Sequence, residues 1–175
     1  MNFEYDTYIV LDVPSPINEI ITSLRKYYND GFRASLPVEI TVAGSSGNGV
    51  IEQGQDEEFV KKTLQHIALR TKPIKTSFKD VLRFPGTDIF VLTLRDEEGF
   101  VELHEQINKS GIKFKYCQFP YKPHCTIRSK SPVSDYEVKA IMKTKIEQEF
   151  VLDTISIYTM NKIPMSKIFS EKLLG

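Results

Sequence analysis

Two short segments of the chain each place a side chain that can exchange protons two residues before a threonine. Residues 36–42 read Leu-Pro-Val-Glu-Ile-Thr-Val, and residues 121–127 read Tyr-Lys-Pro-His-Cys-Thr-Ile. In a β-strand alternate side chains point to one face, so Glu39 shares a face with Thr41 and His124 shares a face with Thr126. A histidine beside a hydroxyl group can hold a phosphate and move a proton.

The two proton-exchanging side chains differ in chemistry. Histidine, with an ordinary pKa of about 6.5, can act as acid or base near neutrality. Glutamate, with an ordinary pKa of about 4.3, is a base at neutral pH and a poor acid unless burial raises its pKa. Its charge also opposes a phosphate, since two like unit charges about 4 Å apart repel by about 4 kcal/mol at an effective dielectric constant of about 20.

Four interpretations of Glu39 therefore stay open. It acts as the base with His124 as the acid, it selects a less anionic or a cationic substrate, or it belongs to a site that binds a ligand without turnover. In the fourth interpretation it only forms a salt bridge with Arg33, Lys122 or Arg128.

The hydrophobic pattern predicts the same series of elements twice. In the first half these are a strand at 8–13, a helix at 17–28 capped by Ser15 with Pro16 at its first position, the first motif strand at 38–43, a helix at 56–70 and a strand at 74–84. In the second half they are a strand at 88–95, a helix from about 100 to 111, the strand that contains His124, a helix around 138–146 and a strand at 150–158. This repeat of roughly 80 residues predicts two lobes related by a pseudo-two-fold axis.

At these two motifs the chain resembles the 2H phosphoesterase superfamily, which includes 2'-5' RNA ligase-like proteins and cyclic nucleotide phosphodiesterases. That family is defined by two His-x-Thr/Ser-hydrophobic motifs, one in each lobe. The second motif matches at His124, whereas the first has Glu39 in place of histidine. The resemblance implies one α+β domain over residues 1–175, with antiparallel sheets around a central cleft and helices outside. Its repeats are about 6–84 and 88–160, followed by a tail, 161–175, in which residues 163–169 could form an edge strand.

The resemblance also implies an activity. This is a metal-independent hydrolysis, without a cofactor, of 2',3'-cyclic phosphates or 2'-5' linkages in nucleotides or RNA ends. His124 would be the acid or base, Thr41 and Thr126 would hold the phosphate, and Glu39 would replace the other histidine. The alternative is a non-catalytic module that binds a nucleotide or an RNA end, and a third interpretation is a structural domain that kept only the shape.

Four further residues are candidates for substrate binding. Arg128 lies two residues beyond Thr126, so in a regular strand its guanidinium faces the same side and could bind the phosphate. Phe32 and Arg33 precede the first motif and Tyr121 precedes the second, where they could form stacking walls for a base. The competing interpretations are an exposed arginine and aromatic rings that only pack.

Other reactive residue types are predicted to have structural roles. We expect His66 to be exposed on its helix, His104 to be a half-buried packing residue, and Cys125 to point into the core because it alternates with His124. None of them has a neighbouring cluster of metal ligands. The segment 44–49 lacks the Gly-Lys-Ser/Thr of a P-loop, and a flexible connection is favoured over a mobile lid or a phosphate-binding loop.

The composition limits the partners. Lys plus Arg and Asp plus Glu both number 23, so no net charge attracts nucleic acid and no extended nucleic-acid surface is evident. The two cysteines are too few for a disulfide framework, and no apolar run approaches a membrane span. We therefore predict a cytoplasmic, reduced protein whose ligand is a small nucleotide or an RNA end, with no indication of its oligomeric state.

Overall fold

The computed structural model describes residues 1–175, which form nine strands and five helices. The strands are β1 (Thr7–Asp12), β2 (Glu39–Ala43), β3 (Ile74–Thr76), β4 (Phe78–Arg83), β5 (Phe90–Leu94), β6 (His124–Arg128), β7 (Phe150–Leu152), β8 (Thr154–Thr159) and β9 (Ser166–Lys172). The helices are α1 (Ile17–Tyr27), α2 (Gly31–Ser35), α3 (Glu57–Ala68), α4 (Glu98–Asn108) and α5 (Asp135–Met142). None of these helices has the length and the apolar character that a membrane crossing requires.

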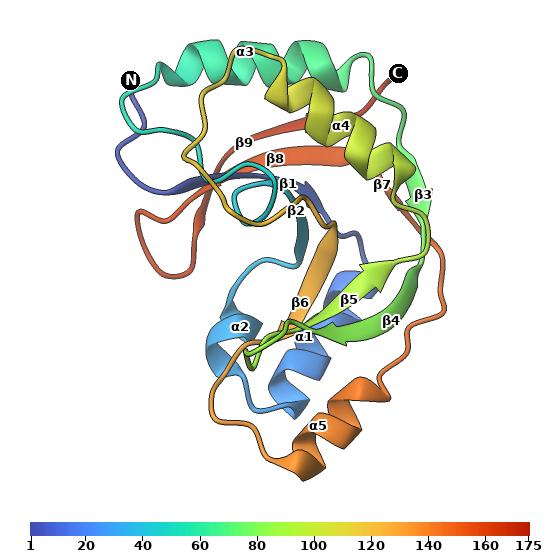
Figure 1. The fold of residues 1–175 in the computed structure, drawn as a ribbon. Helices are drawn as coiled ribbons and strands as arrows, with labels where there is room; N and C mark the ends of the chain where they lie inside the picture. The colour runs from blue at the N-terminus through green and yellow to red at the C-terminus, as the bar shows by residue number, and fades with distance from the viewer.

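The strands form two main antiparallel sheets with helices on their outer sides (Figure 1). One sheet has the order β2-β1-β8-β9 and the other has the order β4-β5-β6, while β3 and β7 form a separate two-stranded ladder. Helices α3 and α4 pack on the first sheet, where they contact β9 and β2. Helices α1 and α5 pack on the second sheet, where they contact β6 and β4. The predicted α+β fold with antiparallel sheets is confirmed.

The two sheets do not coincide with the two sequence repeats. The strand predicted over residues 74–84 divides at Ser77 into β3 and β4, and the strand predicted over 150–158 divides at Asp153 into β7 and β8. Strands β3 and β7 pair with each other, and the chain changes sheet at both of them. After β3 the chain leaves the β1–β2 sheet, and β4 pairs with β5. After β7 it leaves the β5–β6 sheet, and β8 pairs with β1. Each sheet is thus built from both halves of the chain.

Several local predictions are corrected or completed by the structure. Helix α1 has Pro16 at its N-cap, and the Ser15 hydroxyl donates to the Glu19 carboxylate (2.9 Å) instead of capping a backbone N–H. The short helix α2 was not predicted; it begins where the Asp30 carboxylate accepts the Arg33 N–H (2.9 Å). The edge strand predicted over residues 163–169 is present as β9 but begins three residues later, at Ser166, and it pairs only with β8.

Candidate active site

The two motif strands, β2 and β6, contact each other and have the same pattern of burial. Glu39 and Thr41 are half-buried on one side of β2, and His124 and Thr126 are half-buried on one side of β6. The residue between each pair is fully buried, and in β6 this residue is Cys125. The alternation predicted from the sequence is therefore confirmed, including the position of Cys125 in the core.

The pairing of these strands with their neighbours is equivalent in the two sheets. In β1–β2 the partners are Asp12 with Glu39, Val10 with Thr41 and Ile9 with Ala43; in β5–β6 they are Thr93 with His124, Val91 with Thr126 and Phe90 with Arg128. Each ladder thus skips the residue that follows the motif threonine, which is a β-bulge. Glu39 and His124 occupy the same position in two equivalent strand pairs.

The bulge corrects the prediction for Arg128. Because the alternation breaks after Thr126, the Arg128 side chain turns into the protein interior, where it is only 2% exposed. Its guanidinium donates to the Tyr28 carbonyl (3.1 Å) and to the Glu137 carboxylate (3.3 Å). Arg128 therefore does not face the motif side chains and is not available to a phosphate there.

Glu39 lies in an environment that favours its neutral form. Burial raises the pKa of its carboxyl group; a hydrogen bond that Thr41 Oγ1 donates to Glu39 Oε2 (2.9 Å) and the charges of Arg25 and Arg33 partly oppose this rise. Its carboxylate forms no salt bridge with any of the three predicted partners: Arg33 makes no ion pair, Lys122 is paired with Glu97, and Arg128 is paired with Glu137. The interpretation of Glu39 as a simple salt-bridge residue is therefore wrong.

His124 also lies where its neutral form is favoured. Burial lowers the pKa of the imidazole, the hydrogen bond to the Lys122 carbonyl partly opposes this, and the charges of Arg33 and Lys122 lower the pKa further. Nδ1 lies 2.6 Å from the Lys122 carbonyl oxygen, which can only accept, so Nδ1 carries the hydrogen and the Nε2 lone pair is left free in the neutral ring. The Phe84 ring meets the imidazole edge-on, with 5.2 Å between the ring centroids.

Of the predicted substrate-binding residues on α2, Arg33 lies with the motif side chains. Its positive charge acts on the pKa values of both Glu39 and His124. Its guanidinium donates to Ser129 Oγ from Nε (3.3 Å) and from Nη2 (3.1 Å), so the group is oriented by a residue just beyond β6. The neighbouring Phe32 is half-exposed on α2.

Arg25 is a residue of this site that the sequence interpretation missed. It lies on the buried face of α1, 2% exposed, and donates from Nε and Nη2 to the Thr126 carbonyl (3.1 and 2.9 Å). Its Nη1 donates to three carbonyls between α2 and β2, those of Arg33, Leu36 and Pro37 (3.1, 3.2 and 3.2 Å). The Arg25 side chain thus connects the segment that precedes β2 with the second motif strand, β6. The signal for it was a charged residue one helical turn after the buried Ile21.

Tyr121 and His104 hold the first motif strand from the other side. The Tyr121 hydroxyl donates to the Thr41 carbonyl (3.2 Å), and its ring stacks on His104 with 4.0 Å between the centroids. His104 is buried, as a packing residue, and its Nδ1 donates to the Val42 carbonyl (2.8 Å). One face of the Tyr121 ring is therefore covered by protein, and its hydroxyl is engaged in the fold.

The loop 44–49 is attached to the segment that leads into β6. The Gly47 N–H donates to the Phe119 carbonyl (2.8 Å), and the Gly49 N–H donates to the Lys115 carbonyl (3.0 Å). A Cβ atom on Gly49 would lie 2.5 Å from that oxygen, so only glycine allows this approach. The loop is an anchored element and not the flexible connection that its composition indicated.

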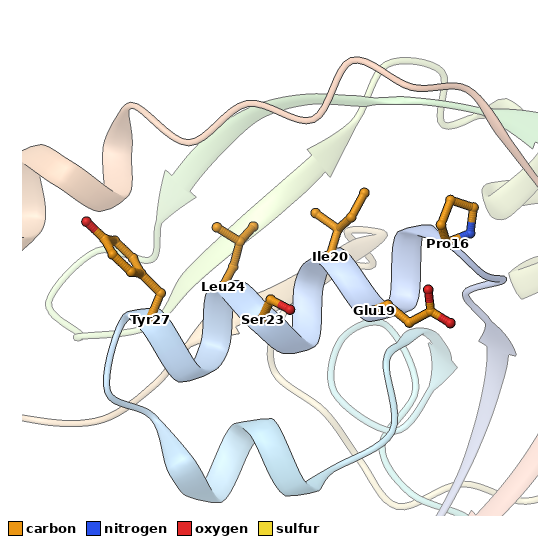
Figure 2. A pocket seen from close by; sticks show the side chains of 6 residues that line it. All are labelled: Pro16, Glu19, Ile20, Ser23, Leu24 and Tyr27. Carbon is orange, nitrogen blue, oxygen red and sulfur yellow. The ribbon is translucent and has the colours of Figure 1, made fainter.

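Two cavities differ in their relation to these residues. A groove of about 540 Å³ runs along α1, where Ile20, Leu24 and Tyr27 line it (Figure 2). None of the motif residues lines this groove, so it is separate from the site. A second cavity, of about 370 Å³, lies over β4 and β5 and is lined by Lys122. No three His, Cys, Asp or Glu side chains lie together as metal ligands, and His66 is exposed on α3.

The fold is that of several solved structures. TT0787 of Thermus thermophilus superposes with a TM-score of 0.68 at 15% identity, covering 100% of this chain and 99% of that chain. LigT of E. coli in its apo form superposes with a TM-score of 0.62 at 17% identity, covering 98% of each chain. A structure described as a phosphoesterase gives a TM-score of 0.61 at 13% identity, covering 99% of this chain and all of that chain.

Sequence comparison reaches the family level. No curated protein is similar enough in sequence to be matched to this chain. The model of the family described as the 2'-5' RNA ligase superfamily matches residues 13–163, which is most of the chain and includes both motif strands. The protein therefore belongs to the 2'-5' RNA ligase superfamily of 2H phosphoesterases.

Proposed function

We propose that the protein is a metal-independent phosphodiesterase that acts on 2',3'-cyclic phosphates or on 2'-5' linkages in nucleotides or RNA ends. In this proposal Glu39 occupies the position of one of the family's two catalytic histidines. The observation that carries it is the equivalence of β2 and β6, which present Glu39 and His124 at matching positions of two strands in contact.

The pKa directions support a division of labour between these two residues. Since burial raises the pKa of Glu39 and lowers that of His124, we assign the role of base to His124 Nε2 and the role of acid to Glu39, the reverse of the assignment that ordinary pKa values suggest. His124 takes a proton from water while the water oxygen forms a bond to phosphorus. The bond from phosphorus to the ribose oxygen breaks, and that oxygen takes the proton of Glu39. Exchange of one proton with solvent restores both groups.

The same assignment removes the electrostatic objection to a carboxyl group beside a phosphate. A protonated Glu39 does not repel the substrate, and its O–H can donate to a phosphoryl or leaving-group oxygen. The Thr126 hydroxyl, which donates to no protein group, and the Arg33 guanidinium supply further donors and charge. LigT of E. coli has been crystallised with 3'-AMP and with ATP, which supports a nucleotide as the ligand of this chain.

The test is hydrolysis of 2',3'-cyclic nucleotides by the purified protein, with and without a chelator. We expect turnover in both conditions, loss of turnover in His124→Ala, and retention of turnover in the control His66→Ala. Hydrolysis that requires added metal, or that survives in His124→Ala, would contradict the proposal.

One contact favours the alternative, a module that binds a nucleotide or RNA end without turnover. The Thr41 hydroxyl donates a hydrogen bond to Glu39, so one of the two threonines expected to hold the phosphate is engaged within the protein. If the parent protein binds nucleotide but does not hydrolyse it, and Glu39→His does hydrolyse it, the alternative holds.

A further inference from the structure

The cavity of about 370 Å³ over β4 and β5 adjoins His124 through two of its lining residues. Thr93 is the direct partner of His124 in the β5–β6 ladder, so their side chains leave the sheet on the same face. Lys122 also lines the cavity, and its carbonyl oxygen is the acceptor for His124 Nδ1. The volume lies within the range of small-ligand sites, which begins at about 300 Å³.

The charged groups of this cavity are not neutralised equally. The two carboxylates in its lining have cation partners, since Glu97 pairs with Lys122 and Asp80 pairs with Lys145 at 3.6 Å. The other two cations in the lining, Lys79 and Arg95, pair with no carboxylate. The one hydrogen bond of the Arg95 guanidinium goes from Nε to Ser77 Oγ (3.3 Å), which leaves both Nη groups free. Two unpaired positive groups therefore line the cavity that Thr93 and Lys122 connect to His124.

We propose that this cavity is a subsite for a second phosphate group of the substrate, held by Lys79 and Arg95. The proposal rests on the proposed function, because it takes the reacting phosphate to lie at His124 and Glu39. Arginine binds phosphate with two parallel N–H donors and lysine binds it as a mobile point charge, so the pair suits a phosphate that must be oriented without being cleaved. A nucleoside 2',3'-cyclic phosphate with no other phosphate would leave this subsite empty.

A second phosphate can come from two sources. It can be the adjacent phosphodiester of an RNA chain, or it can be a 5'-phosphate on the nucleotide whose ribose carries the reacting group. The two sources place the same chemical group in the cavity but differ in the covalent path that leads to it. Separate ligands can therefore distinguish them.

The test measures binding of three ligands that the enzyme cannot hydrolyse further. These are 3'-AMP, adenosine 3',5'-bisphosphate, and an adenosine trinucleotide that ends in a 3'-phosphate and lacks a 5'-phosphate. Calorimetry gives each dissociation constant in the parent, in Lys79→Ala/Arg95→Ala, and in the control Lys62→Ala/Lys72→Ala. The control removes two exposed cations outside the cavity, so the net charge changes equally.

We expect the parent to bind at least one of the two longer ligands about tenfold more tightly than 3'-AMP, and Lys79→Ala/Arg95→Ala to reduce that ratio to below about twofold. The control pair should keep the ratio. The slope of log Kd against log salt for the preferred ligand should fall by about 0.7 for one lost phosphate contact. A preference for the bisphosphate alone identifies a 5'-phosphate, and a preference for the trinucleotide alone identifies an RNA chain.

Three results would overturn the subsite: no preference in the parent, a preference that survives Lys79→Ala/Arg95→Ala, or an equal loss in the control pair. Hydrolysis of cyclic nucleotides without any preference would refute the subsite and leave the proposed function intact. A preference that depends on Lys79 and Arg95 in a protein that hydrolyses nothing would refute the proposed function alone. If the parent binds none of the three ligands, the subsite is refuted, and hydrolysis of 2',3'-cyclic nucleotides decides the proposed function.

Discussion

The motif strands β2 and β6 share a backbone design and differ in how their reactive side chains are held. Both have the same burial pattern and a bulge after the threonine. In β6 the backbone carbonyl of Lys122 orients His124, and the Thr126 hydroxyl donates to no protein group. In β2 the Thr41 hydroxyl donates to Glu39 itself. The repeat thus preserves the position of the reactive groups while leaving their hydrogen bonding to local chemistry.

Burial shifts the pKa values of Glu39 and His124 in opposite directions. Removal from water disfavours the charged form of any group, so it raises the pKa of the Glu39 carboxyl and lowers that of the His124 imidazole. The carboxyl therefore becomes a better acid for neutral pH, and the imidazole keeps its lone pair.

The carbonyls of the two threonines provide a second point of comparison. The Thr126 carbonyl accepts from the Arg25 guanidinium, and the Thr41 carbonyl accepts from the Tyr121 hydroxyl. Each motif strand is thus fixed by a side chain that belongs to a distant part of the sequence. The charged contact at β6 also reaches the lead-in to β2, whereas the Tyr121 contact reaches β2 alone.

The largest expected effect is on the β6 side of the comparison. His124→Ala should reduce kcat/KM for 2',3'-cyclic nucleotides by roughly 10²- to 10⁴-fold, because a positioned proton-transfer group is lost. Steady-state kinetics measures this, with His66→Ala as the matched control on the exposed surface of α3. Equal activity of the two variants would show that the strands are not a catalytic pair.

Removal of Arg25 should destabilise the connection between the strands. Arg25→Met removes the guanidinium donor from four partly buried carbonyls, and we expect a loss of about 3 kcal/mol in the free energy of unfolding. Urea denaturation measures this against Lys26→Met, which removes a neighbouring exposed cation.

Arg25 also lowers the pKa of Glu39 through its charge. In folded Arg25→Met the pH–rate limb that reports Glu39 should therefore move to higher pH. An unchanged limb would show that Arg25 acts only on stability and not as a positioning residue.

Two substitutions of Glu39 test the role of β2 in the proposed reaction. Glu39→Gln should lower kcat/KM by about 100-fold, or about 2.7 kcal/mol, since an amide cannot give up the proton that the leaving oxygen needs. Glu39→His should retain turnover, because it restores a group that titrates near neutrality. Glu102→Gln, on the exposed face of α4, is the control. Full activity of Glu39→Gln would refute Glu39 as the acid.

The smallest expected effect is a pair of opposite pH dependences of stability. The raised pKa of Glu39 gives stability that is complete below the ordinary value of about 4.3 and is lost as pH rises through the folded value, so Glu39→Gln should gain relative to the parent as pH rises. The lowered pKa of His124 gives stability that is present above about 6.5 and is lost as pH falls through the folded value, so His124→Gln should gain as pH falls. Urea denaturation between about pH 4.5 and 8 measures both, and slopes of the same sign would contradict the assignment.

The sequence by itself determined most of the elements and the faces of the two motif strands. The alternation in residues 39–42 and 124–127 indicated which side chains share a face, and the burial of Cys125 confirms it. The helices around residues 17–28, 56–70 and 100–111 were likewise readable, because periodicity is a local property of the chain. The repeat placed Glu39 in the position that corresponds to His124, and the two ladders confirm that this position is equivalent.

Only the tertiary structure decided where the chain crosses between sheets and which charged groups reach the site. The breaks at Ser77 and Asp153 arise because β3 must pair with β7, a contact between segments far apart in sequence. Strand alternation predicted that Arg128 faces the site, but the bulge turns its side chain into the core. Arg25 contacts the second motif strand, which its position on a helix did not predict. Register and burial depend on which surfaces meet, and the same contacts remove Glu39 and His124 from water, which raises the pKa of the first and lowers that of the second.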